Sequence, residues 1–398
     1  MTESVAAPWS RAEVFNWLIR EGRLMPSADQ LLAQTCQRIA AAGLPLDRVA
    51  VFIWTLHPLY FGLRLLWDGH SVDVAETEYS VQQSEAYRQS PVVRIRNGER
   101  LIRRRLADPQ CLMDFAVLEE LQDQGFADYL LSELVFSDGQ RHGVSVATKR
   151  ASGFTENDIA ELEVLLQVLA LVLECHVNRR FSQTLLNTYL GKKSGARVLD
   201  GTIRRGDGEL IDAVIWYCDL RDSTRLSLAL GNEEFLAVLN DYFEATAGAV
   251  LDAGGEILRF IGDASLAVFA IEPGDDGPKR ACRDAVCAAN AAVDRAENAN
   301  QRRRESDKPQ FEFGIGLHRG EVLYGNIGTP GRLEFSVIGP AANEAARIEA
   351  LCKSTGAQLV ATSAVLEHVD ETWSSLGYFE IRGLDRPLEL HAPARRCA

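Results

Sequence analysis

The sequence has no Cys-x-x-Cys pair among its eight cysteines, so it signals neither a zinc knuckle nor a disulfide framework. It also has no apolar run of the roughly 18 to 20 residues that a membrane helix needs. The longest candidate, 165–177, is interrupted by Gln167, Glu174 and His176. The first residues are polar or small and form no signal-peptide core. These absences predict a cytoplasmic protein with reduced cysteines and no membrane segment.

Basic residues are fewer than acidic ones: the sequence has 42 Lys and Arg against 56 Asp and Glu, which gives a net charge of -14. Neutralising nucleic-acid phosphates requires a basic patch. The one basic run, 302–304, is followed by Glu305 and Asp307, and we interpret it as a solvated loop. We therefore expect no nucleic-acid partner. The remaining composition, 46% hydrophobic and 25% charged over 398 residues, is typical of a globular protein with two or three domains.

The N-terminal part mixes helical and strand patterns. Thr155 followed by Asp158 forms a capping-box pattern that begins a long helix, which we expect to continue to about residue 189. An apolar stripe along this helix suits either the core of its own domain or the seam of a dimer, and periodicity alone does not separate the two. The stripe consists of Ile159, Leu162, Leu166, Leu169 and Leu173. The other predicted elements are a helical region at 11–42, strands at 48–56, 60–67, 129–137 and 143–148, and a helix at 114–124.

Residues 143–174, a last strand followed by a long closing helix, resemble the end of a GAF domain. The resemblance implies that residues 1–177 are a GAF-like sensory or regulatory α/β domain that responds to a small molecule or a protein. No residue in this part of the sequence identifies the small molecule or protein to which the domain responds. We assign 178–210 to the rest of the helix and a glycine-rich linker, which is either a passive connector or a transmitting element.

From 211 to 398 the pattern is regular and forms the expected second domain. Its βαββαβ order predicts an antiparallel α+β sheet with helices on one face. We expect strand pairs that turn at Gly262-Asp263 and at Arg319-Gly320. The predicted strands are 211–218, 256–261, 265–271, 311–318, 321–324 and 335–338, and the predicted helices are 233–251, 279–298 and 342–352.

Two aspartates in this domain come directly after apolar strands. Asp219 ends the first strand, and Asp263 lies in the turn of the next pair. Two such carboxylates side by side make a hard oxygen site for Mg²⁺ or Mn²⁺. Taken singly, Asp219 also suits a helix N-cap and Asp263 an ordinary turn residue.

Five motifs in order resemble the class III nucleotidyl cyclases, mainly adenylate cyclases. The resemblance implies that residues 211–398 adopt a ferredoxin-like fold. They are 216–224 (WYCDLRDST), 259–263 (RFIGD), 314–320 (GIGLHRG), 325–328 (GNIG) and 337–347 (VIGPAANEAAR). The resemblance implies that Asp219 and Asp263, helped by the backbone carbonyl of Leu220, hold two Mg²⁺ or Mn²⁺ ions. One ion activates the ribose 3′-hydroxyl and the other anchors the triphosphate, so that ATP closes to 3′,5′-cyclic AMP and pyrophosphate.

The same resemblance assigns roles to three further residues. Asn343 orients the ribose, and Arg347, four positions later on one helix face, stabilises charge on the α-phosphate. Arg332 is a candidate for the β- or γ-phosphate, with plain solvent exposure as the alternative. In this family the metal aspartates and the Asn/Arg pair come from opposite subunits, so the resemblance implies a homodimer.

Two positions that choose the base in this family hold unusual residues. Arg259 stands where adenylate cyclases usually have Lys, and Ser336 stands where they usually have Asp or Thr. Serine has a hydroxyl that can replace that of threonine, which suits adenine. Arginine can also donate to adenine, but it pairs well with guanine. We therefore expect ATP, with GTP and a guanylate cyclase as the alternative. A catalytically inactive nucleotide-binding module is a second alternative. A diguanylate cyclase is a third, but the Gly-Gly-Asp/Glu-Glu-Phe signature of that family does not occur in this sequence.

Overall fold

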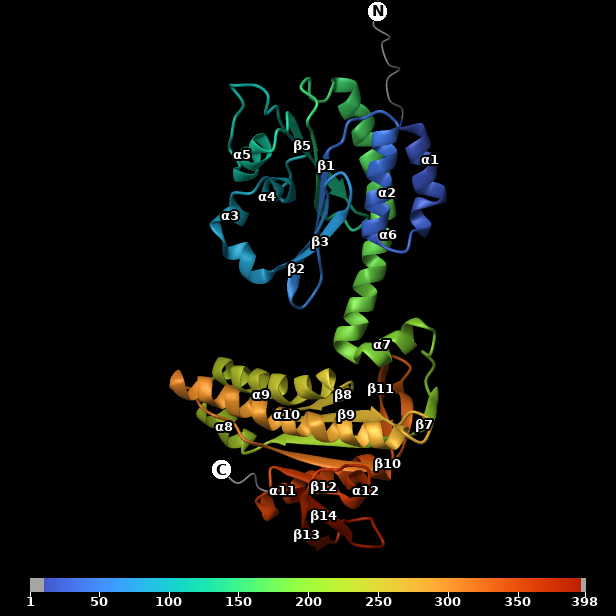
Figure 1. Ribbon diagram of the computed structural model, residues 1–398, viewed down its shortest axis with the longest axis vertical. Helices are drawn as coiled ribbons and strands as arrows, with labels where there is room; N and C mark the ends of the chain where they lie inside the picture. Colours follow the sequence, from blue (N-terminus) through green and yellow to red (C-terminus); the bar gives the residue numbers. More distant parts are fainter. Residues whose placement is uncertain (1–10, 395–398) are drawn as a thin grey trace, which may run out of the picture. The chain divides into compact units, whose positions relative to one another are not determined.

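A computed structural model describes residues 11–394, and the chain divides into two compact units, with the boundary between Leu185 and Leu186 (Figure 1). Both units combine a sheet with helices, which confirms the predicted α+β class. The sheet of the first unit is antiparallel, and that of the second is antiparallel except for the parallel pair of β10 and β12. Within the described residues, no helix carries an apolar stretch long enough to cross a membrane.

The first unit is built on a six-stranded antiparallel sheet in the order β3-β2-β1-β6-β5-β4. Helices α1, α2 and α6 pack on one face, and α4 and α5 cover part of the other. The strands are β1 (Arg48–Trp54), β2 (Tyr60–Trp67), β3 (Val72–Glu78), β4 (Leu101–Arg104), β5 (Asp128–Val135) and β6 (Arg141–Thr148). The helices are α1 (Ala12–Arg20), η1 (Gly22–Leu24), α2 (Ala28–Ala41), η2 (Tyr79–Gln83), α3 (Glu85–Arg88), α4 (Pro91–Arg96), α5 (Ala116–Asp123) and α6 (Glu156–Leu190).

The helical region predicted at 11–42 is two helices joined by a 3₁₀ turn, since Pro26 interrupts the pattern. Helix α6 begins with the predicted capping box: the Asp158 amide donates to Thr155 Oγ1 at 3.1 Å and the Thr155 amide to Asp158 Oδ2 at 2.9 Å. The apolar stripe of α6 from Ile159 to Leu173 is buried in the core of its own unit. The core interpretation of that stripe is therefore confirmed, and the seam interpretation of the same five residues is wrong.

The second unit contains an eight-stranded sheet in the order β13-β14-β12-β10-β7-β9-β8, with β11 paired to β10. The segment β7-α9-β8-β9-α10-β10 gives the ferredoxin-like βαββαβ core. The strands are β7 (Gly208–Leu220), β8 (Glu256–Ile261), β9 (Ala264–Ala270), β10 (Phe313–Thr329), β11 (Arg332–Ile338), β12 (Leu359–Thr362), β13 (Trp373–Phe379) and β14 (Leu388–Pro393). The helices are α7 (Lys192–Leu199), α8 (Ser223–Ala229), α9 (Asn232–Asp252), α10 (Gly277–Glu305), α11 (Pro340–Thr355) and α12 (Ser363–Leu366).

Helices cover both faces of the second sheet, which corrects the expectation of one covered face. Strand β7 alternates its side chains, so Val214 and Trp216 pack under α9 and α10, while Ala213 and Ile215 pack under α11 and β11. Figure 1 shows α9 and α10 lying alongside each other over the sheet. The sheet is therefore the middle layer of the unit.

Strand β10 is continuous through Arg319 and Gly320, so the turn predicted there is wrong. Gly320 pairs with Ala213 of β7, and a Cβ at Gly320 would lie 2.7 Å from the Cβ of Ala341 on α11. The glycine serves close approach of a helix to the sheet, a role that the sequence pattern does not distinguish from a turn.

Two further expectations are corrected in this unit. Part of the glycine-rich connector forms helix α7, so it is not uniformly flexible. The arginine run expected in a solvated loop forms the last turn of α10. Arg303 is buried there and its guanidinium pairs with Glu234 and Asp241 of α9, which joins the two helices.

Candidate functional site

The two predicted metal aspartates lie beside each other at one end of the central strands. Strand β7 pairs with β9 so that Asp219 faces Ala264, and Asp263 occupies the turn immediately before Ala264. Gly262 takes a φ of +64° in this turn, a conformation that favours glycine. The Leu220 amide donates to the Asp263 carbonyl at 3.4 Å and fastens the turn to the strand end. The strand end and the hairpin turn thus bring the two carboxylates together.

Asp219 and Asp263 line an open cavity of about 690 Å³. Its other wall is the start of the chain after β7 together with helix α8. The remaining lining residues are Leu220, Asp222, Ser223, Thr224, Arg225, Leu228 and Ala229. The side chain of Leu220 is buried in the core beneath α9 and α10, so it is the backbone of Leu220 that is suited to face a ligand here.

The electrostatics of this pair favour a bound cation. Burial raises the pKa of Asp219, and the like charge of the Asp263 carboxylate raises it further, while Arg221 opposes the shift. Asp219 Oδ1 is buried and has no hydrogen-bond partner within residues 11–394. A buried carboxylate oxygen without a partner is costly, and a divalent cation would satisfy it.

The residues fit Mg²⁺ or Mn²⁺ in a particular way. Within the part of the chain that the structure describes, no group of three or more His, Cys, Asp or Glu side chains is placed to hold a metal. Mg²⁺ is commonly held by one or two carboxylates together with waters and substrate phosphates. Two aspartates in an open cavity, with the Leu220 carbonyl nearby, match that pattern better than an all-protein cage.

An ion pair that no sequence motif indicates lies next to the cavity. Arg221 Nη2 lies 3.0 Å from Oε1 of Glu349, a residue of α11 that is 3% exposed. The contact is an ion pair rather than an aligned hydrogen bond. Burial raises the pKa of Glu349 to about 7, with Asp219 raising it as well and Arg221 opposing the shift. Glu349 and Arg221 come close to Asp219 because the strand register sets Gly314 of β10 opposite Asp219. No local sequence motif indicates this contact.

The two base-choosing candidates lie on β8 and β11, which are in contact. Arg259 Nη2 donates to Glu334 Oε2 at 2.6 Å, and Ser336 is buried two positions further along β11. Alternate residues of a strand share a face, so Arg332, Glu334 and Ser336 lie on one side of β11. Arg332 is exposed and forms no ion pair with any other described residue. Glu334 is a neighbour of Arg259 that the sequence did not indicate.

Asn343 and Arg347 lie on one face of α11, as their spacing predicted, and this face is exposed. The guanidinium of Arg347 donates to the backbone carbonyl of Arg382. Neither residue lines the cavity that holds Asp219 and Asp263, and neither do the three candidates on β8 and β11. The structure therefore brings together the metal candidates, but it leaves the nucleotide candidates in other parts of the unit.

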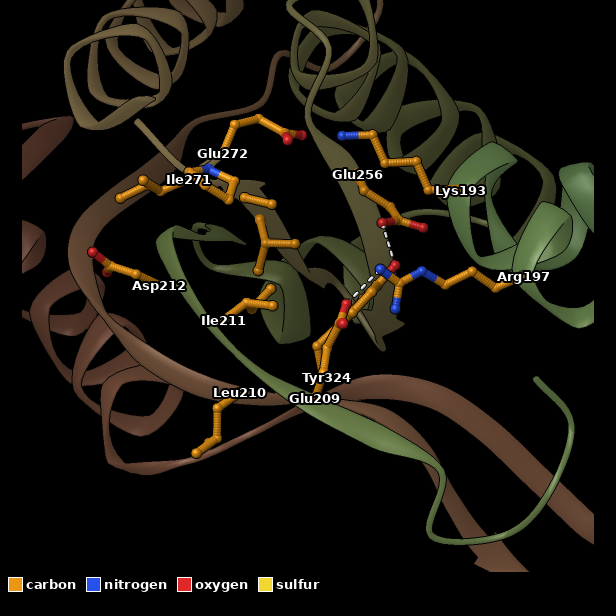
Figure 2. A pocket seen from close by; sticks show the side chains of 13 residues that line it. Lys193, Arg197, Glu209, Leu210, Ile211, Asp212, Glu256, Ile271, Glu272 and Tyr324 are labelled. Carbon is orange, nitrogen blue, oxygen red and sulfur yellow. Dashed lines mark hydrogen bonds and ion pairs between the residues drawn. The ribbon is translucent and has the colours of Figure 1, made fainter. Parts of the chain in front are cut away.

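A second cavity, of about 580 Å³, lies at the opposite end of β7 (Figure 2). Its polar wall is a satisfied network: Tyr324 donates to Glu256 Oε2 at 2.6 Å, and Ser194 of α7 donates to Glu256 Oε1 at 2.6 Å. Arg197 stacks over Tyr324 and pairs with Glu209. Because these groups already satisfy one another, we interpret the network as the contact that fixes α7 to the sheet of the second unit.

The second unit is similar to known proteins. Residues 209–391 match the family model of the adenylate and guanylate cyclase catalytic domain. An adenylate cyclase of Anabaena cylindrica is 33% identical over 177 residues, which are 44% of this chain and 34% of the relative. The chain spans about a third of the length of the curated relatives it matches.

Solved cyclase structures are similar to about half of the chain. The adenylyl cyclase CyaB of P. aeruginosa is 22% identical with a TM-score of 0.43, covering 48% of this chain and 98% of that one. The guanylyl cyclase Cya2 is 31% identical with a TM-score of 0.40, covering 46% of this chain and 92% of that one.

Proposed function

We propose that this chain converts ATP to 3′,5′-cyclic AMP and pyrophosphate, because residues 209–391 match the family model of the adenylate and guanylate cyclase catalytic domain. The observation that carries the proposal is the pair Asp219 and Asp263, which share one open cavity with a buried carboxylate oxygen left free.

Each group of residues has a distinct task in this reaction. Asp219 and Asp263, with the Leu220 carbonyl, hold the divalent cations. When bound, such cations lower the pKa of the ribose 3′-hydroxyl and offset the charge of the triphosphate. Asn343 fixes the ribose, and Arg347 donates to the α-phosphate as its charge grows.

We propose that two copies of the chain assemble the site. Asn343 and Arg347 face solvent rather than the cavity of their own chain. Large apolar side chains are exposed on the neighbouring elements β8, β10 and β11, which suits a buried contact between copies. They are Phe260, Ile261, Leu323, Leu333 and Ile338.

Helix α6 offers a second contact for the same dimer. Besides its buried stripe it exposes Val164 and Leu171, seven residues apart and therefore on one face of the helix. We propose that the first unit, a GAF-like domain whose signal is unknown, regulates the cyclase through α6 and through α7. The buried contact of Ser194 with Glu256 supports that route, because it fastens α7 to β8.

The preference for ATP rests on Arg259 and Ser336, which supply donors and a hydroxyl for the adenine edge. One observation favours GTP as a second candidate: the carboxylate of Glu334 lies beside Arg259 and is suited to accept from the N–H groups of guanine. The two nucleotides therefore have to be compared directly.

The test is to incubate the full chain with Mn²⁺ and either ATP or GTP, and to identify the product by mass spectrometry. Cyclic AMP is expected as the main product, and cyclic GMP in its place selects the second candidate. Asp219→Ala and Asp263→Ala are expected to abolish turnover while leaving the folded structure intact. Asp275→Ala, in the exposed loop before α10, is the matched control and should turn over normally. Nucleotide binding without any product would leave an inactive module.

A further inference from the structure

The ion pair of Arg221 and Glu349 lies directly beside the proposed metal carboxylate. Asp219 and Gly314 are opposite partners in the antiparallel pair of β7 and β10, so their side-chain positions share a face at about 5 Å. A Cβ at Gly314 would lie 2.0 Å from Arg221 Nη2 and 2.4 Å from Glu349 Oε1. The two charged groups therefore occupy the space of the missing side chain, next to Asp219.

Arg221 nevertheless makes no hydrogen bond or ion pair with Asp219 within the described residues. A guanidinium beside a carboxylate ordinarily pairs with it, since such charged contacts are among the strongest hydrogen bonds in proteins. Here Glu349 engages Arg221 at 3.0 Å, while Asp219 Oδ1 stays buried without a partner. An unpartnered oxygen of this kind requires an explanation.

The position of Glu349 is fixed by the packing of α11 on β10. A Cβ at Gly316 would lie 2.6 Å from the Glu349 amide nitrogen and 2.8 Å from the Ala345 carbonyl oxygen. Helix α11 therefore packs directly on the backbone of Gly314 and Gly316, which have no side chains. This close packing places the Glu349 carboxylate at the end of β7.

We propose that Glu349 is a positioning residue for the metal site: it holds the guanidinium of Arg221 away from Asp219, so that the Asp219 carboxylate stays free for a divalent cation. This inference rests on the proposed function, because it takes Asp219 to be a metal ligand. Without the Glu349 charge, Asp219 is the neighbouring carboxylate to which Arg221 turns, and a cation then has to displace it.

The test measures Mn²⁺ binding to the full chain without nucleotide, at a pH above 7 where the Glu349 carboxylate is ionised, from the electron paramagnetic resonance signal of free Mn²⁺. Asp219→Ala defines the binding that belongs to other sites. Glu349→Gln keeps the side-chain shape and is expected to raise the Kd about tenfold, the effect of one charged hydrogen bond that the cation must break. Adding Arg221→Met to that variant removes the competing charge and should return the Kd to near the wild-type value.

A purely structural role, in which the ion pair of Arg221 and Glu349 only holds α11 against β7, predicts a different result. In that case Arg221→Met and Glu349→Gln weaken binding alike, and the double variant is no better than either. That result, an unchanged Kd in Glu349→Gln, or a wild-type chain that binds no Mn²⁺ at Asp219, would overturn the proposal. If Glu349→Gln does not fold, Arg221→Met alone decides, because the proposal requires it to bind Mn²⁺ at least as tightly as the wild type. A wild type that binds Mn²⁺ but makes no cyclic nucleotide refutes the proposed function and leaves these titrations to judge the inference.

Discussion

Acid is expected to destabilise the first unit through a single buried histidine, His142 on β6. The side chain is 2% exposed, its Nδ1 accepts the backbone amide of Trp54 at 3.1 Å, and its ring lies 4.1 Å from that of Phe136. Burial lowers the pKa of His142 from 6.5 to about 4, against the raising effect of Asp138 and Glu174. The folded state therefore holds the neutral ring with Nδ1 as an acceptor.

The sign and size follow from proton linkage. Between pH 6.5 and pH 4 the unfolded state binds the proton and the folded state does not, so the free energy of unfolding falls as the pH falls through this range. The full effect is about 3 kcal/mol, and above pH 6.5 this histidine contributes no pH dependence. A loss of that size is a large part of the stability of an ordinary domain.

The measurement is a series of urea titrations between pH 7.5 and pH 4, read by hydrogen exchange of peptides from β1 and β6 and corrected for intrinsic exchange rates. These peptides report the first unit alone. His142→Asn keeps an acceptor for the Trp54 amide but does not titrate, so its stability should fall less steeply with acid than that of the wild type. The exposed His70→Asn is the control and should follow the wild type. Equal slopes for wild type and His142→Asn would refute the reasoning.

Three further outcomes are expected. Arg347→Ala should bind nucleotide almost normally but lose turnover by about a hundredfold or more, because its contact strengthens as charge develops; equal losses of affinity and turnover would contradict this. Mixing Asp219→Ala chains with Asn343→Ala chains should restore part of the activity, since one of the two sites in each heterodimer is intact; no recovery in proven heterodimers would exclude shared sites. Tyr324→Phe removes the donor to buried Glu256 and should lower the free energy of unfolding of the second unit by about 1–3 kcal/mol, measured by urea unfolding against the exposed Tyr378→Phe control.

The parts of the site that the sequence predicted are those that depend on local pattern. An apolar strand followed by a carboxylate placed Asp219 at the end of β7, and Gly262 marked a turn because glycine tolerates positive φ. Helical spacing likewise placed Asn343 and Arg347 on one face of α11. Each of these features is decided within a few residues of chain.

The errors arose where a distant segment decides what a residue does. Gly320 was interpreted as a turn, yet it is the place where Ala341 of α11 meets β10. The basic run predicts a solvated Arg303, yet this residue is buried and pairs with acidic residues of α9 that lie 62 and 69 positions earlier in the chain. Glu334 and Glu349 acquire their roles only from the pairing of β11 and the packing of α11, and no periodicity carries that information.

Helix α11 links the two halves of the proposed reaction within one chain. Its buried face carries Glu349, which engages Arg221 beside the metal candidates, and its opposite face presents Asn343 and Arg347 to solvent. The helix rests on bare backbone at Gly314 and Gly316, so it cannot roll to turn its outer face toward the cavity of its own chain without breaking the contact of Glu349. Under the proposed function, each α11 therefore serves its own cavity through Glu349 and the cavity of a second copy through Asn343 and Arg347. A shift of α11 would then change both sites of the dimer together, which is the coupling that a regulator acting on the dimer contact requires.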